Sequence, residues 1–113
     1  MSPEAFDAVC RALPGSTMDV QWGDDHVYKV GGRMFAVTSP RGGCSFKCSD
    51  IAFEALTEGG TGRPAPYLAR AKWVRLDSLD AMPDADLEAH LAAAHALVAA
   101  KLTRAQRREI GLA

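Results

Sequence analysis

The sequence predicts an α+β domain in which helices pack on one antiparallel sheet. Apolar residues recur at helical spacing near the N-terminus, after Ser49 and after Pro83, whereas the stretch from Thr17 to Lys47 alternates with a period of two. The resulting order of a helix, several strands, a helix, a strand and a long helix is typical of a two-layer sandwich with about five strands. The chain of 113 residues fits a single domain, 1–113, whose core needs no metal or disulfide.

The first helix is predicted to begin after Ser2, which is a good N-cap, with Pro3 in its first turn. Its apolar positions share one face and are Phe6, Val9, Cys10 and Leu13. Pro14 and Gly15 end the helix. Cys10 is therefore expected to be a small buried apolar residue.

The clearest pair of strands is VYKVGGRMFAV, where Gly31 and Gly32 can adopt the positive φ of a type I′ turn. That register places one set of side chains on a common face: Tyr28, Val30, Arg33 and Phe35. The opposite face then holds Val27, Lys29, Met34 and Ala36. Further turns at residues 22–25 and 40–43 predict a meander of about four short strands.

A second helix is expected after Ser49 and Asp50, ending at two glycines and followed by the loop 59–66. Its apolar contacts are predicted to come from Ile51, Phe53 and Leu56. The last strand is predicted around residues 72–76. Strand alternation would place Arg70, Lys72 and Val74 on one face, and Ala71, Trp73 and Arg75 on the other, with Trp73 in the core.

The longest helix is predicted to start at Pro83 and Asp84. Its apolar stripe is Leu87, Leu91, Ala94, Val98 and Leu102. Thr103 is expected to cap a final short helix.

Composition and charge favour a soluble, cytoplasmic protein with no membrane association. The N-terminus lacks the features of a signal peptide, and the longest apolar run is too short to cross a bilayer. Three cysteines indicate reduced thiols, because Cys44 and Cys48 on one strand would lie roughly 13 Å apart. The net charge of −1 divides into −2 for residues 1–40, +3 for residues 41–75, −5 for residues 76–100 and +3 for residues 101–113.

Residue sets that could carry catalysis or bind a metal are sparse. Asp24, Asp25 and His26 are adjacent, but neighbouring strand side chains point to opposite faces and converge poorly on a metal. The spacing of Cys44 and Cys48 does not match a zinc ribbon. His90 and His95 lie about 140° apart around a helix, so they do not form a ligand pair. His95 is expected to be half-buried and hydrogen-bonded. We therefore expect no cofactor, no metal and no catalytic residues.

The order of several motifs along the chain resembles the MmcQ/YjbR-like family of small bacterial proteins. The matching residues are Pro14-Gly15, the hairpin from Tyr28 to Ala36, Lys47, Pro64-Ala65 through Lys72-Trp73-Val74, and Leu76, Pro83-Asp84 and Leu87. The resemblance implies a fold akin to that of secretion chaperones and a DNA-binding "double wing" arrangement. This chain differs from the family pattern at one place on the long helix: it has Ala94-His95 where members commonly have Ser-Tyr.

The leading hypothesis is a non-enzymatic cytoplasmic module that binds double-stranded DNA weakly and without sequence preference. The candidate contacts are Lys47, Arg63, Arg70, Lys72 and Arg75, with Lys29 and Arg33 at the hairpin tip as a second wing. The alternative is a domain that binds a protein partner, or a second copy of itself, through an apolar sheet face or the Ala-rich long helix. A third interpretation is a small-molecule binder or enzyme that uses His26 or His95.

Overall fold

A computed structural model describes residues 1–112 of the chain. The strands are β1 (Ser16–Gln21), β2 (Asp25–Val30), β3 (Arg33–Thr38), β4 (Cys44–Lys47), β5 (Arg63–Pro64) and β6 (Trp73–Leu76). The helices are α1 (Pro3–Ala12), α2 (Asp50–Glu58), α3 (Asp84–Ala99), α4 (Arg104–Glu109) and the short 3₁₀ helix η1 (Ala69–Ala71). The predicted α+β architecture is confirmed, and β5 adds a two-residue strand at one edge of the sheet.

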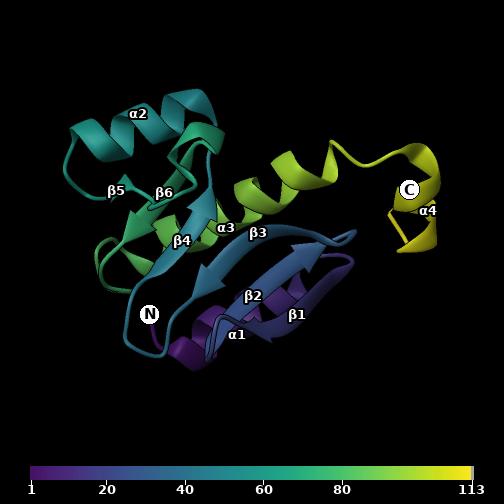
Figure 1. The fold of residues 1–113 in the computed structure, drawn as a ribbon, viewed down its shortest axis with the longest axis horizontal. Coiled ribbons are helices and arrows are strands. Elements are labelled where there is room, and N and C mark those ends of the chain that lie inside the picture. Colours follow the sequence, from purple (N-terminus) through teal and green to yellow (C-terminus); the bar gives the residue numbers. More distant parts are fainter. Residues whose placement is uncertain (113) are drawn as a thin grey trace.

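The six strands form one antiparallel sheet in the order β1-β2-β3-β4-β6-β5 (Figure 1). Two neighbouring rows of side chains cross this sheet and point to opposite faces. The row that faces the core contains Tyr28, Ala36, Phe46 and Val74, all with no exposed surface. The next row contains Val27, Val37, Ser45 and Arg75 and belongs to the other face, which we call the open face.

Helices α1 and α3 pack together on the core face, and α2 lies beside β5 and β6. The predicted stripe of α3 is confirmed, because Leu87, Leu91 and Ala94 are completely buried. The predicted caps are also confirmed: the hydroxyls of Ser2 and Ser49 accept hydrogen bonds from backbone N–H groups of α1 and α2. These caps define where the helices begin, and the sheet determines which side of each is buried.

The β2–β3 hairpin has the predicted turn but a different arrangement of faces. Gly31 and Gly32 have φ values of 58° and 78°, as a type I′ turn requires. A β-bulge then shifts the register, so that Tyr28 is paired with Ala36. The prediction that Ala36 lies on the face opposite Tyr28 is therefore wrong, because the extra residue of the bulge brings Ala36 into the core.

Two predictions for the second half of the chain are also wrong. Ile51 does not supply apolar contact to the core, because its place on the outer side of α2 leaves it 82% exposed. Residues 69–71 form η1, and Lys72 has the left-handed φ of 61°, so the strand starts only at Trp73. The predicted alternation of Arg70 and Lys72 along a strand therefore does not occur.

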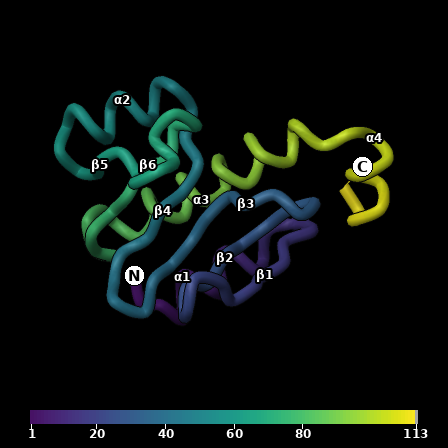
Figure 2. Tube along the Cα trace, viewed as in Figure 1, coloured from purple at the N-terminus to yellow at the C-terminus, as the bar shows by residue number. Residues whose placement is uncertain are grey.

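The C-terminal helix α4 projects at one end of the long axis of the molecule (Figure 2). Its N-terminus has the predicted cap at Thr103, in a reciprocal capping box with Gln106. Leu102, just before this cap, packs close to Gly31, where an added Cβ would lie 2.6 Å from the leucine side chain. Across residues 1–112, the helices are all too short or too polar to pass through a lipid bilayer.

Candidate nucleic-acid interface

Three lysines from separate segments gather beside the N-terminus of α2, and we call them the lysine cluster: Lys47, Lys72 and Lys101. Lys47 ends β4, Lys72 lies between η1 and β6, and Lys101 follows α3. Burial and then the charge of Lys101 lower the pKa of the Lys47 ammonium group; Lys72 adds a smaller effect of the same sign, and Asp50 opposes both. Lys101 and Lys72 therefore both add to the positive potential at Lys47.

The local structure holds the lysine cluster in position. Lys47 donates a hydrogen bond from Nζ to the carbonyl oxygen of Ala71, which ties β4 to the end of η1. The Lys72 ammonium group lies 5.0 Å from the centre of the Phe53 ring in α2. Neither contact neutralises the charge, and within residues 1–112 none of the three lysines forms an ion pair.

The N-terminus of α2 adds a second source of positive potential next to the lysine cluster. Ser49 caps this helix, and unsatisfied N–H groups and the helix dipole favour negative charge near its first turn. A shallow pocket of about 350 Å³ lies here, lined by Lys47, Ser49 and residues of α3. Asp50 in the first turn reduces the potential, so the cluster provides most of the attraction for an anion.

Arg70 extends the same side of the molecule from η1, where its side chain is exposed. Arg70 lies two residues from Lys72. The left-handed backbone conformation of Lys72 means that the two residues do not share a strand face. The two residues that were expected to share a strand face therefore flank the end of η1. Arg33 is exposed at the end of the β2–β3 hairpin and, like Arg70, forms no ion pair within the described part of the chain.

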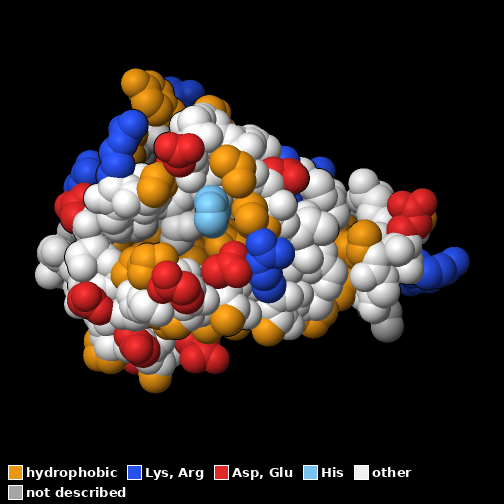
Figure 3. All heavy atoms as spheres, turned by 90° about the horizontal axis from the view of Figure 1, so that it is seen from below, with side chains coloured by type: hydrophobic (Ala, Val, Ile, Leu, Met, Phe, Trp, Pro, Cys, Tyr) orange, Lys and Arg blue, Asp and Glu red, His pale blue; other side chains and the backbone are white. Residues whose placement is uncertain are grey.

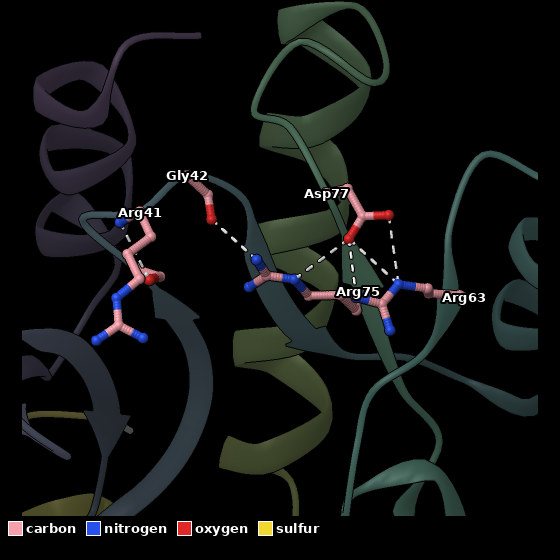
Figure 4. Close-up of polar contacts among 6 residues, drawn as sticks. Arg41, Gly42, Arg63, Arg75 and Asp77 are labelled. Atoms are coloured by element: carbon pink, nitrogen blue, oxygen red, sulfur yellow. Dashed lines mark hydrogen bonds and ion pairs between the residues drawn. The ribbon is translucent and has the colours of Figure 1, made fainter.

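Two of the predicted arginines are engaged in ion pairs. Arg63 lies 2.9 Å from Asp77, and Arg75 lies 3.7 Å from the same carboxylate (Figure 4). Arg75 also donates a hydrogen bond of 2.9 Å to the carbonyl oxygen of Gly42. Hydrogen bonding to Arg63 outweighs partial desolvation and lowers the pKa of the Asp77 carboxyl. These arginines are engaged at the β5–β6 end of the sheet and have less charge available for a ligand.

Lys29 is likewise engaged, because its ammonium group lies 3.1 Å from the Asp19 carboxylate across β1 and β2. Of the seven predicted contacts, Lys47 and Lys72 come together, and Arg33 and Arg70 remain exposed and unpaired among residues 1–112. Lys101 was missed by the sequence reasoning. The +3 charge of residues 101–113 was its only signal, and that charge does not indicate which segment the lysine approaches.

Charge is distributed unevenly over the surface. Figure 3 shows acidic side chains scattered over one face, with basic side chains at its upper left edge, along its upper margin, near its centre beside an acidic one, and at the C-terminal end. The acidic segment 76–100, which includes α3, lies behind the sheet. The lysine cluster lies at the margin around α2 and η1, where positive potential favours an anionic ligand.

His95, Cys44 and Cys48 are buried within the fold. His95 is 7% exposed, its Nε2 lies 2.7 Å from the Pro14 carbonyl oxygen, and its ring meets Phe35 edge-on, as predicted for a hydrogen-bonded core histidine. Burial raises the pKa of the thiols of Cys44 and Cys48 to about 12 and about 11, so both are protonated at neutral pH. Among residues 1–112 no three His, Cys, Asp or Glu side chains are grouped as a metal site.

The fold and the lysine cluster define a small α+β module with one helix-covered face, one open face and a cationic margin. The YjbR family model matches residues 11–97, and the chain belongs to this family. The structure is similar to the crystal structure of Deinococcus radiodurans protein DR2400, which has a DUF419 domain, with a TM-score of 0.85 and 28% identity over 97% of this chain and 88% of that one. No curated protein matches the sequence.

Proposed function

We propose that the protein is a non-catalytic module that binds the sugar–phosphate backbone of nucleic acid through the lysine cluster. The observation that supports this proposal is the convergence of Lys47, Lys72 and Lys101 beside the N-terminus of α2. Ammonium groups and helix N-termini are common phosphate-binding elements. Contacts of this kind carry no base specificity, so binding is expected to be independent of sequence.

The number of free cations sets the strength of this interaction. Three phosphate contacts correspond to a slope of about −2.7 in a plot of log affinity against log salt concentration for duplex DNA. Affinity should therefore fall about 40-fold between 50 and 200 mM salt. The protein is expected to bind weakly at physiological salt, in contrast to proteins with a strongly basic surface.

The test is fluorescence anisotropy with a labelled DNA duplex at these two salt concentrations. The double variant Lys72→Ala/Lys101→Ala should lower the affinity at 50 mM salt at least tenfold and reduce the salt slope by about two. A matched control is Lys29→Ala/Arg63→Ala, which removes the same charge from side chains already paired with Asp19 and Asp77. Absence of binding at 50 mM salt, or equal losses in the two double variants, would overturn the proposal.

A second candidate function is association with a protein partner or a second copy of the chain through α3. Exposed small residues on this helix favour it: Ala92, Ala93, Ala96 and Ala100. Closely spaced alanines allow another helix to approach the backbone. Light scattering on the purified protein should then give a dimer mass that Ala93→Glu/Ala96→Glu returns to the monomer mass, whereas a monomer with no retained protein partner would count against it.

A further inference from the structure

The open face of the sheet carries the largest hollow described on the molecule, a groove of about 560 Å³. Its apolar lining includes Met34, Val37 and Leu68, and the Arg75 side chain also lines it. It therefore lies over the middle strands β3, β4 and β6, away from the helices. A volume of this size is in the range of pockets that hold small organic ligands.

Two aromatic residues beside this groove are unusually exposed. Trp22, in the β1–β2 turn, is 64% exposed, and Tyr67, before η1, is fully exposed. Large apolar rings are normally buried, so their presentation to solvent has to be explained by something other than packing. Two such rings along one groove make a surface on which flat ligands can stack.

The backbone at both aromatic residues is strained. Trp22 has a φ of 51° and Tyr67 a φ of 67°, in the left-handed region that bulky residues seldom occupy. Glycine or asparagine would adopt this conformation at lower cost. Strain of about 1–3 kcal/mol at such positions tends to be associated with functional sites. The exposure and the strain are independent observations, and both occur at the same two residues.

The position of the groove restricts what can bind in it. A peptide that adds a strand to a sheet needs an edge with free backbone groups. The groove lies over Val37, Ser45 and Arg75, in strands whose two neighbours are already paired. A ligand on the open face must therefore be held by side chains alone, through stacking on the rings, hydrogen bonds and charge.

The charged and polar groups near the groove suit a nucleotide. Arg75 lines it but is engaged by Asp77 and the Gly42 carbonyl oxygen, so the available positive charge comes from Arg41 and Arg70. Both are exposed in the adjoining segments, and the Arg41 guanidinium points away from the ion pairs of Arg75 (Figure 4). Ser39, Ser45 and Asp25 supply acceptors for the amino groups of a base. Aromatic rings with neighbouring arginines are a common arrangement for binding unpaired bases.

We propose that this groove binds one or two unpaired nucleotides of a single-stranded nucleic acid, with bases stacked on Trp22 and Tyr67. A duplex cannot occupy it in this way, because its bases are stacked inside the helix. The short segment 67–72 joins the groove to the lysine cluster, so a strand leaving the groove can place its next phosphates near Lys72. This inference rests on the proposed function for its phosphate contacts, and it adds the preference for unpaired bases.

The intrinsic fluorescence of Trp22 provides a direct measurement. The chain has two tryptophans, and Trp73 is only 4% exposed, so quenching by an added oligonucleotide reports mainly on Trp22. Titration with an eight-nucleotide oligothymidine should quench this signal, and affinity should exceed that for a duplex of equal length. An abasic oligonucleotide of the same length should bind about tenfold more weakly.

Variants locate the binding in the groove, with anisotropy of a labelled oligonucleotide as the readout. Trp22→Ala and Tyr67→Ala should each weaken single-strand binding about tenfold and leave duplex binding unchanged. Val20→Ala is the matched control, because it removes a similarly exposed apolar side chain from β1, outside the groove lining, and should change neither affinity.

The outcomes separate the two proposals. The groove inference is overturned, and the proposed function is left intact, by one pattern of results. In that pattern duplex binding depends on Lys72 and Lys101, while Trp22→Ala and Tyr67→Ala leave single-strand binding unchanged. If neither nucleic acid binds, both proposals fail. A dimer that Trp22→Ala dissociates, with no effect of the oligonucleotide on fluorescence, would assign the groove to a second copy of the chain and overturn the inference.

Discussion

The two faces of the sheet are built from the same strands and differ in what covers them. On the core face, Tyr28, Phe46 and Val74 are completely buried beneath the helix layer. On the open face, Val37, Ser45 and Arg75 occupy the neighbouring row and are all partly exposed. Because strand side chains alternate, one short segment can supply both the stability of the fold and a recognition surface. Substitutions on the two faces should therefore have separable effects.

The largest expected effect is on the core face. Phe46→Ala should lower the free energy of unfolding by about 4 kcal/mol, since it removes a completely buried ring and leaves a cavity. Its neighbour on the open face provides the control, and Ser45→Ala should change the value by less than about 0.5 kcal/mol. Urea denaturation followed by circular dichroism measures both. Similar costs for the two variants would show that the faces do not differ in this way.

Trp73 tests the limit of the comparison, because it lies on the open face and is nevertheless only 4% exposed. The prediction that Trp73 is buried is confirmed. Trp73 pairs with Lys47 across β4 and β6, however, and does not belong to the main core cluster. Backbone bonds join it to Ala65 and Leu68 of the preceding segment. Trp73→Ala should cost about 3 kcal/mol in urea denaturation and expose residues 65–72 to limited proteolysis. A cost below 1 kcal/mol would mean that the segment does not depend on the ring.

A smaller effect is expected from the hydrogen bond that the Tyr28 hydroxyl donates to Asp7 at 2.7 Å. Burial opposes ionisation of Asp7, but hydrogen bonds from Tyr28 and Arg11 outweigh it and lower the pKa of the carboxyl below its ordinary value of 3.8. A carboxyl with a lowered pKa contributes stability above the ordinary value, and this stability is lost as the pH falls through the folded value.

Tyr28→Phe should therefore cost about 1.5 kcal/mol at pH 7. The difference from the natural protein should shrink below about pH 4, as Asp7 becomes protonated in both proteins. Urea denaturation at pH 7, 5 and 3 provides the measurement. A difference that stays constant over this range would show that the hydroxyl does not act through the ionised carboxylate.

The smallest expected effect concerns the strained residue on the open face. Trp22→Gly should stabilise the protein slightly, by about 0.5 kcal/mol, because glycine adopts the positive φ without strain and little buried surface is lost. Thermal unfolding at constant pH detects this change. A clear loss of stability would indicate that the indole packs more tightly than its 64% exposure suggests.

Local signals in the sequence were sufficient for most of the fold. Ser2, Ser49 and Thr103 begin helices as predicted, and the Gly31-Gly32 turn fixes a hairpin, because capping and positive φ depend on residues a few positions apart. The register beyond the turn was less accessible. The bulge that brings Ala36 opposite Tyr28 depends on how the whole sheet packs against α3.

The candidate interface was less predictable than the fold. Two of the predicted cations, Lys47 and Lys72, belong to the lysine cluster, but Lys101 joins them from more than twenty-five residues away in sequence. Arg63 and Arg75 looked equally suitable in the sequence and are paired with Asp77. Whether a charged side chain is free or engaged depends on which segments the fold brings within a few ångströms, and local sequence patterns do not specify that distance.

By itself, the sequence determined the order of helices and strands, their caps and turns, and the face of α3 that enters the core, since these follow from local hydrogen bonding and from hydrophobic periodicity. The tertiary structure alone decided which lysines converge beside α2, which arginines pair with Asp77, and that Trp22 and Tyr67 border one groove. These features arise from contacts between distant segments, whose distances are set only when the sheet has closed on its helices.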